Sequence, residues 1–121
     1  MGRAAAFQQA MLAGDRGIMT AALAPEVSFK SPAVHKPYQG REAVMVVLGA
    51  AHHVLEGLAY IETVESDDRT VLFFTAHVGG RDVEGIDALR FDEAGQVREL
   101  VVMIRPHSAL NAVMEAMARR L

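Results

Sequence analysis

A glycine pair between two β-rich segments constrains the fold of this chain more than any other feature of its sequence. The turn over 79–82 reads Gly-Gly-Arg-Asp and separates the segments 71–78 and 83–91, which both alternate and contain β-branched and aromatic residues. Such a turn between alternating segments predicts a β-hairpin. A two-residue loop made of the second glycine and the arginine places Phe74 opposite Asp87.

The alternation divides this hairpin into two faces, and one face is almost wholly apolar. Its members are Leu72, Phe74, Ala76, Val78, Val83, Gly85, Asp87, Leu89 and Phe91. Asp87 is the single charged residue in that set. Because an unpaired buried carboxylate is unfavourable, it needs a partner, a proton or a functional reason. Asp87 is therefore the first candidate for a site residue.

Length and composition limit the classes of protein to which the chain can belong. Its 121 residues suit one domain over 1–121, and 51% hydrophobic with 22% charged residues is typical of a globular protein. A net charge of -3 with scattered basic residues argues against nucleic-acid binding. The chain has no cysteine, which excludes disulfides and thiolate metal sites. We find neither a membrane span nor a signal peptide, and expect a cytoplasmic protein without a membrane partner.

Periodicity along the rest of the chain predicts four helices and three further strands. The helices are expected over 4–13, 16–23, 41–55 and 108–120, and the strands over 26–31, 58–66 and 96–105. Helices gather at the start and strands toward the end, which favours an α+β fold with an antiparallel sheet. A strongly bent sheet around the helices leaves a concave cavity, a common site for small ligands.

The last expected strand is apolar on both faces near its end. Leu100, Val102 and Ile104 lie on one face, and Val101 and Met103 lie on the other. Both faces need to be covered, and the helices can cover only one. A second copy of the chain is the simplest cover for the other face, so we expect a homodimer through the convex face of the sheet.

Several landmarks resemble the nuclear transport factor two-like (SnoaL-like) superfamily. They are Gly14-Asp15, the segment 27–32 (VSFKSP), Gly40-Arg41-Glu42, and the segment 87–92 (DALRFD) with Gly95, and they span nearly the whole chain. The resemblance implies a cystatin-like, cone-shaped half-barrel in which a curved antiparallel sheet wraps N-terminal helices. Its mouth would hold a small, often apolar ligand. The superfamily includes isomerases, polyketide cyclases, dehydratases, epoxide hydrolases and non-catalytic binding modules, so the fold alone does not define a function.

Within the superfamily, the nearest pattern is that of ketosteroid isomerase. Asp87 stands where that family has its oxyanion-hole aspartate, an acid kept protonated by an apolar site. Phe7 stands in place of the oxyanion tyrosine, and Ser31 in place of the general-base carboxylate. The resemblance therefore implies a site with one donor fewer and without the usual base. Polyketide cyclases of the superfamily use pocket histidine and aspartate residues, which keeps His52 as a candidate.

His52 is the second candidate site residue after Asp87. The apolar stripe of the helix expected over 41–55 turns His52 inward, toward the sheet that carries Asp87. Such a pair at a cavity could act as general acid and base. A core histidine bonded to Asp87 without any ligand is the structural alternative. His77 is expected opposite Glu84 on the convex face, and the spacing of the five histidines predicts no metal site.

We therefore expect a cofactor-free protein that binds a largely apolar, steroid- or polyketide-like molecule carrying a carbonyl or hydroxyl group. The expected ligand-binding residues are Phe7, Met11, Ala22, Ser31, Leu48, Phe74, Leu89, Val102 and Ile104. If the protein is an enzyme, we expect an isomerase, cyclase or dehydratase with Asp87 as acid and His52 as base. The alternative is a non-catalytic, dimeric protein–protein interaction module with a vestigial pocket. A cavity above roughly 300 Å³ favours ligand binding, whereas a filled cavity with Asp87 bonded internally favours the alternative.

Overall fold

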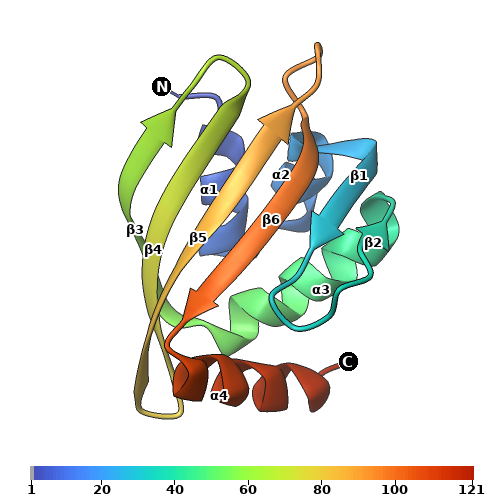
Figure 1. Cartoon of the computed structure of the whole chain (residues 1–121). Helices are drawn as coiled ribbons and strands as arrows, with labels where there is room; N and C mark the ends of the chain where they lie inside the picture. Colours follow the sequence, from blue (N-terminus) through green and yellow to red (C-terminus); the bar gives the residue numbers. More distant parts are fainter. Residues whose placement is uncertain (1) are drawn as a thin grey trace.

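A computed structural model describes residues 2–121, and it confirms an α+β fold built on one curved sheet (Figure 1). The helices are α1 (Ala5–Ala13), α2 (Arg16–Ala22), α3 (Arg41–Val54) and α4 (His107–Ala118). The strands are β1 (Leu23–Lys30), β2 (Tyr38–Gln39), β3 (Glu56–Glu65), β4 (Arg69–Val78), β5 (Arg81–Phe91) and β6 (Val97–Arg105). Strand β2 lies between the strand expected over 26–31 and the helix expected over 41–55, where no strand was expected.

The first two helices are separated by the landmark pair that the sequence showed. Gly14 ends α1 in the left-handed conformation, with φ of 67°. A side chain at this position would also meet His52, because an added Cβ atom would lie 2.5 Å from Nε2 of that ring. Asp15 caps α2, and its Oδ1 accepts a hydrogen bond from the amide of Ile18 at 2.9 Å. The backbone therefore reverses here, and the amide of Ile18 at the start of α2 still has a hydrogen-bond partner.

The sheet has six strands in the order β2-β1-β6-β5-β4-β3, and it is mixed rather than antiparallel. Strands β1 and β6 run parallel, whereas the other neighbouring strands run antiparallel. Our expectation of an antiparallel sheet is thus wrong at this one pair. The reason is that β1 and β6 are joined through α3 and four intervening strands, and a parallel pair needs such a long crossover. Local alternation carries no information about that pairing.

The hairpin forms as expected, but its register differs from the prediction by two residues. The two-residue loop is Gly79-Gly80, with φ of 55° and 79°, as a primed hairpin turn requires. Asp87 therefore lies opposite Leu72, and His77 opposite Asp82. A shift of two residues keeps every side chain on its own face, so the predicted apolar face is retained.

The same shift corrects the partners of two surface residues. Nδ1 of His77 lies 3.0 Å from Oδ1 of Asp82, and the predicted contact of His77 with Glu84 is wrong. Glu84 instead forms an ion pair with Arg105 on the neighbouring strand β6.

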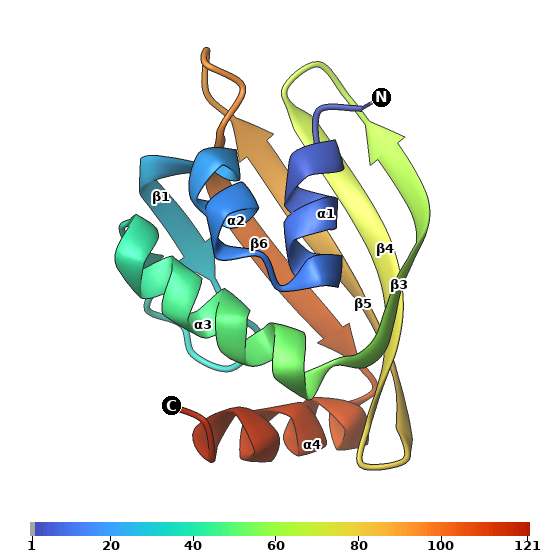
Figure 2. The ribbon, with the colours of Figure 1, turned by 180° about the vertical axis from the view of Figure 1, so that it is seen from behind.

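The helices cover the concave face of the sheet, and the described part of the chain places no helix on the opposite face (Figures 1 and 2). Helices α1, α2 and α3 cross the back of the sheet in Figure 1, while α4 lies along one end. One core cluster joins α1 and α3 to the sheet around Phe7, Leu72 and Leu100. A second cluster joins the far end of α3 to α4 and to the tip of the hairpin. No helix in the described part of the chain is long and apolar enough to cross a membrane.

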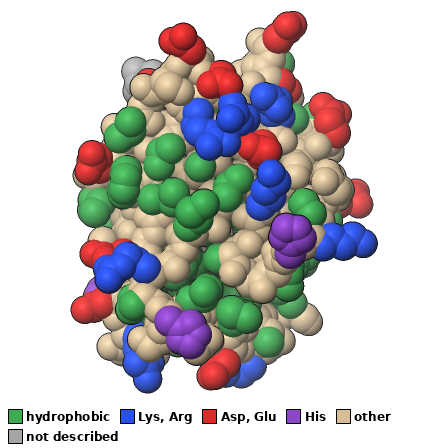
Figure 3. All heavy atoms as spheres, in the orientation of Figure 1, with side chains coloured by type: hydrophobic (Ala, Val, Ile, Leu, Met, Phe, Trp, Pro, Cys, Tyr) green, Lys and Arg blue, Asp and Glu red, His purple; other side chains and the backbone are tan. Residues whose placement is uncertain are grey.

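Hydrophobic side chains form a band across the convex face, and basic side chains gather above it (Figure 3). The band includes Ile61, Phe73 and Met103, which are 64%, 37% and 58% exposed. The register places Phe73 beside Ile86 and Ile86 beside Met103, so the band runs across neighbouring strands. Such a contiguous apolar surface is typical of an interaction site.

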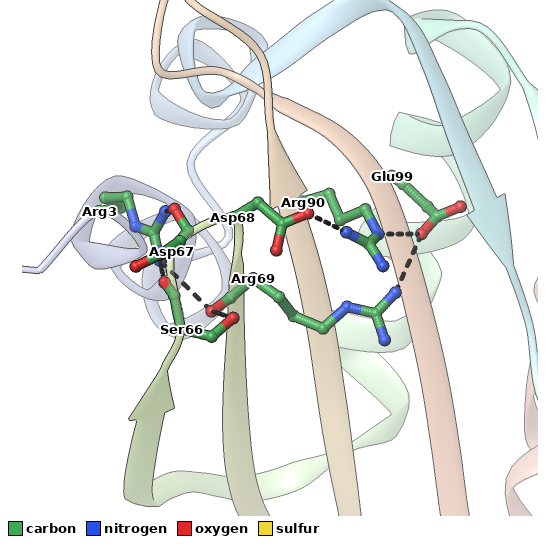
Figure 4. Close-up of polar contacts among 7 residues, drawn as sticks. All are labelled: Arg3, Ser66, Asp67, Asp68, Arg69, Arg90 and Glu99. Carbon is green, nitrogen blue, oxygen red and sulfur yellow. Dashed lines mark hydrogen bonds and ion pairs between the residues drawn. The ribbon is translucent and has the colours of Figure 1, made fainter.

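An ionic network around Glu99 lies on the same strands as this band, and Figure 4 shows part of the network. Glu99 on β6 accepts contacts from Arg69 at 3.3 Å, Arg90 at 3.4 Å and Lys30 at 3.6 Å. Arg90 also pairs with Asp68 in the turn between β3 and β4. Because the network joins β1, β6, β5 and this turn, it connects strands that are far apart in the chain.

Candidate ligand cavity

A cavity of about 250 Å³ lies between the concave face of the sheet and helices α1, α3 and α4. Its lining is Phe7, Met11, Phe29, Ser31, Pro32, Ala33, Tyr38, Val47, Leu48, Ala51, Leu55, Leu58, Tyr60, Phe74, Asp87, Val102, Ile104, Leu110, Val113, Met114, Met117, Ala118 and Leu121. The deep end is formed by buried residues such as Phe7 and Phe74, whereas Ala33 and Leu121 are exposed and mark the mouth. The mouth thus lies between the loop after β1 and the end of α4.

Most of the residues expected to bind a ligand line this cavity. They are Phe7, Met11, Ser31, Leu48, Phe74, Val102 and Ile104. Ala22 and Leu89 do not line it. Leu89 is fully buried in the core cluster, and Ala22 is the last residue of α2, a helix that contributes nothing to the lining.

Asp87 brings the single carboxyl group into this apolar space. It lies in the middle of β5, between Leu72 on β4 and Val102 on β6, and only 6% of its surface is exposed. Burial raises the pKa of Asp87 to about 7, because the charged form loses its hydration, while a hydrogen bond from Tyr60 lowers the pKa in part. Near neutral pH, both the protonated and the ionised forms of Asp87 are therefore populated.

Tyr60 is the site residue that reasoning from the sequence missed. Its hydroxyl donates a hydrogen bond to Oδ2 of Asp87 at 3.3 Å, and its ring meets Phe74 edge to face, with centroids 6.5 Å apart. Burial, followed by the charge of Asp87, raises the pKa of Tyr60 far above its usual value, so the phenol stays protonated. The alternation Leu58-x-Tyr60 was the available signal. The intervening residues Ala59 and Ile61 are also apolar, so the sequence did not show which face of this strand is inward.

His52 faces inward as the helical stripe predicted, but the structure does not bring it to Asp87. Nδ1 of His52 lies 2.7 Å from the carbonyl oxygen of Met11 near the end of α1. The ring packs against His53, with centroids 5.3 Å apart, and lines a separate hollow beside Gly14. The predicted pair of His52 and Asp87 is not formed, because His52 lines the hollow beside Gly14, whereas Asp87 lines the cavity. His52 instead joins two helices and satisfies a helix-end carbonyl.

Ser31 and Tyr38 are the remaining polar residues of the lining. Oγ of Ser31 accepts hydrogen bonds from the amides of Ala33 and Val34, each at 3.2 Å, and so shapes the turn at the mouth. The ring of Tyr38 on β2 stacks on Phe29, with centroids 5.9 Å apart. Within residues 2–121, the lining contains no lysine, arginine or histidine. Asp87 is thus the one group in the cavity suited to proton transfer near neutral pH.

Taken together, the fold and the cavity define an open α+β half-barrel with an apolar cavity and one buried acid at its deep end. A steroid delta-isomerase from Pseudomonas aeruginosa is 37% identical in sequence, with a TM-score of 0.91 over 98% of this chain and 88% of that chain. An uncharacterized protein with a cystatin-like fold from Silicibacter pomeroyi is 30% identical, with a TM-score of 0.93 over 98% of this chain and 84% of that one. This chain belongs to the nuclear transport factor two-like (SnoaL-like) superfamily.

A more distant similarity extends the same fold to other members. A putative SnoaL-like polyketide cyclase from Shewanella denitrificans is 12% identical, with a TM-score of 0.71 over 94% of this chain and 95% of that chain. At this identity, the similarity shows the fold alone. A scan against protein-family models and a search of curated proteins found no match.

Proposed function

We propose that the cavity binds a compact, largely apolar molecule through a carbonyl or hydroxyl oxygen placed beside Asp87. The observation that carries this proposal is the buried carboxyl group of Asp87, the one acidic side chain among the described residues of a largely apolar lining. A protonated Asp87 donates a hydrogen bond to a carbonyl oxygen, and an ionised Asp87 accepts one from a hydroxyl group. The similarity to a steroid delta-isomerase supports a cyclic ketone as the ligand class.

The size of the cavity limits the ligand. Its volume of about 250 Å³ lies below the roughly 300 Å³ at which drug-sized ligand pockets begin. The cavity is open rather than filled, yet Asp87 already has an internal partner in Tyr60. The open cavity favours ligand binding, whereas the hydrogen bond between Tyr60 and Asp87 favours a pocket without a ligand. Because the volume is small, we expect a ligand of about two rings, or one end of a larger molecule that extends through the mouth.

Isomerase chemistry at this site would have an acid but no strong base. Moving a double bond into conjugation with a ketone requires a base that carries a proton from the α carbon to the γ carbon. It also requires a donor for the oxygen that becomes negative. Asp87 would supply the donor. Ser31 is neutral, and the ring of His52 contacts Met11 outside the cavity. We therefore propose ketone binding with slow turnover.

A substitution at the mouth tests this assignment. The amides of Ala33 and Val34 bond to Ser31, and a carboxylate at this position accepts the same two bonds, so Ser31→Asp keeps the turn and adds a base. With a β,γ-unsaturated octalone, we expect wild type to bind but isomerise slowly, and Ser31→Asp to isomerise on the order of 10² to 10⁴ times faster. The rise in ultraviolet absorbance of the conjugated product measures this rate.

Two variants are the controls for that experiment. Ser31→Asn has the shape of the aspartate without its basicity, and we expect no gain in rate. Asp87→Asn in the Ser31→Asp background removes the acid, and the gain should fall by at least tenfold. Ketone binding that is unaffected by Asp87→Asn, together with no gain from Ser31→Asp, would sink the proposal.

We also propose that the convex face pairs with a second copy of the chain. The observation that favours this is the exposed apolar band around Ile61, Phe73 and Met103, bordered by the ionic network of Glu99. Acidic and basic side chains lie within a short distance of each other in that border, so the surface can be complementary to itself about a two-fold axis. The cavity opens on the other side of the sheet, and pairing leaves it accessible.

Light scattering coupled to size-exclusion chromatography tests this pairing. Met103→Glu places a charge in the middle of the band, and we expect a monomer where wild type is a dimer. Val46→Glu is the matched control, because Val46 on α3 is 59% exposed and Met103 is 58% exposed. The pairing is excluded if wild type is monomeric at high micromolar concentration, or if both variants change the mass alike.

A further inference from the structure

The cavity contains an acid but no basic side chain to balance its charge. Asp87 is its single carboxylic acid, and the other titratable residues of the described lining are Tyr60 from β3 and Tyr38 from β2. Helices α1, α3 and α4 contribute only uncharged side chains to the lining. An ionised carboxylate in such a place needs either a proton or a cation brought from outside.

Five aromatic rings contribute to the walls of this cavity. The chain has five phenylalanines and two tyrosines, seven aromatic residues in all, and three phenylalanines with both tyrosines line the cavity. Tyr60 and Phe74 meet edge to face near Asp87, and Phe7 forms part of the same deep end. The face of an aromatic ring attracts cations, and the attraction is greatest where water is excluded. The aromatic rings and the ionised carboxylate therefore both attract a positively charged ligand.

We propose that the cavity also binds a compact lipophilic ammonium ion, tertiary or quaternary, with its nitrogen beside the carboxylate of Asp87. Its alkyl or aryl groups would lie against Phe7, Tyr60 and Phe74, the residues that form the apolar deep end. The inference rests on the site of the proposed function but, unlike the binding of a ketone, it uses the ionised form of Asp87. A carbonyl ligand requires the protonated acid, whereas an ammonium ion requires the ionised one. The two ligand classes therefore bind with opposite pH dependence.

A pair of ligands with the same shape and different charge tests the inference. Benzyltrimethylammonium carries a permanent positive charge, and in neopentylbenzene a carbon replaces the nitrogen. The methyl signals of Met11, Met114 and Met117 report binding in an NMR titration, because these three residues line the cavity. With the pKa of Asp87 at about 7, the affinity for the cation should rise on the order of a hundredfold from pH 5 to pH 8. The affinity for neopentylbenzene should not change.

Variants assign the effect to Asp87. We expect Asp87→Asn to weaken binding of the cation at pH 8 by tenfold or more and to leave neopentylbenzene binding intact, which also shows that the cavity still forms. Glu93→Gln, at an exposed turn residue, should change neither ligand. The inference is wrong if the two ligands bind wild type equally at pH 8, or if the affinity for the cation does not depend on pH. Both results come from wild type alone, so they hold even if Asp87→Asn does not fold.

The β,γ-unsaturated octalone separates this inference from the proposed function. Its affinity should be highest at pH 5, where Asp87 is protonated and can donate to the carbonyl oxygen. Binding of the octalone without the cation would overturn the ammonium inference alone. Binding of the cation without the octalone would overturn the proposed function alone.

Discussion

At Asp87, burial raises the pKa of the carboxyl group, and a hydrogen bond from one hydroxyl group lowers it. Burial disfavours the charged form, and the hydrogen bond from Tyr60 stabilises it. Tyr60 itself stays protonated, because the loss of hydration and the charge of Asp87 both oppose its ionisation. The phenol therefore keeps its proton, and the proton on the acid is the one that varies near neutral pH. This makes Tyr60 a residue that tunes Asp87 rather than a second acid.

Removing the phenol should raise the pKa of Asp87 further. In Tyr60→Phe the ionised carboxylate loses its donor, so we expect the pKa to move above about 7 and the protein to lose about 1 kcal/mol of stability. A carbon-13 NMR titration of the Asp87 carboxyl carbon measures the shift. Tyr38→Phe is the control, because its ring stacks on Phe29 away from this hydrogen bond. An unchanged pKa in Tyr60→Phe would show that the 3.3 Å contact does not stabilise the charge.

Among the elements, β5 is held closest to its neighbours at Gly85. An added Cβ atom there would lie 2.4 Å from Cζ of Phe74 and 2.6 Å from the backbone oxygen of Met103. The ring of Phe74 is a wall of the cavity, so this glycine lets β5 approach β6 while Phe74 keeps its place. A glycine in the middle of this strand is therefore explained by close packing, as glycine in such positions often is.

Two alanine substitutions should therefore have opposite effects on stability. Gly85→Ala forces Phe74 and a strand backbone to shift, and we expect a loss of about 1–3 kcal/mol. Gly49→Ala lies on the exposed side of α3 with nothing within 4 Å of the added atom, and we expect a gain of about 0.5–1 kcal/mol from helix propensity. Urea unfolding midpoints compare the two variants with wild type. Equal changes of one sign would contradict the packing account.

For the molecule as a whole, Asp87, the one buried acid among residues 2–121, has no counter-charge and links folding to pH. The pKa of Asp87 rises from an ordinary value of 3.8 to about 7 on folding, so the folded chain holds this proton more tightly than the unfolded chain. The stabilisation is complete below about pH 4 and is lost as the pH rises through about 7. Asp87 therefore opposes folding at high pH, as expected for a residue kept for its chemistry.

Asp87→Asn should remove this dependence. From pH 4 to pH 8, we expect wild type to lose on the order of 4 kcal/mol relative to Asp87→Asn, as the shift of the pKa implies. Free energies of unfolding in urea at intervals of pH give the two curves, and their difference isolates Asp87 from the other acids. Glu93→Gln should follow wild type at every pH, because Glu93 is exposed. Parallel curves for wild type and Asp87→Asn would show that Asp87 is not desolvated.

Much of this protein could be predicted from local patterns in its chain. Alternation placed Asp87 on the inner face of the sheet even though the hairpin register was shifted by two residues, because a side-chain period of two survives such a shift. The pair Gly14-Asp15 also lies between the two helices expected from periodicity, and these residues end α1 and cap α2. Helical periodicity also turned His52 inward.

The contacts between distant elements could not be predicted in this way. The parallel pairing of β1 with β6, the bond of Tyr60 to Asp87 and the contact of His52 with Met11 each join residues far apart in the chain. A pattern of period two or 3.6 tells which side of an element faces inward, but not which element lies opposite. The sequence by itself therefore determined the helices and the longer strands, the inward faces of the hairpin and of α3, and the buried acid. Only the tertiary structure decided the partner of that acid, because packing in three dimensions sets the distance between side chains that the chain keeps apart.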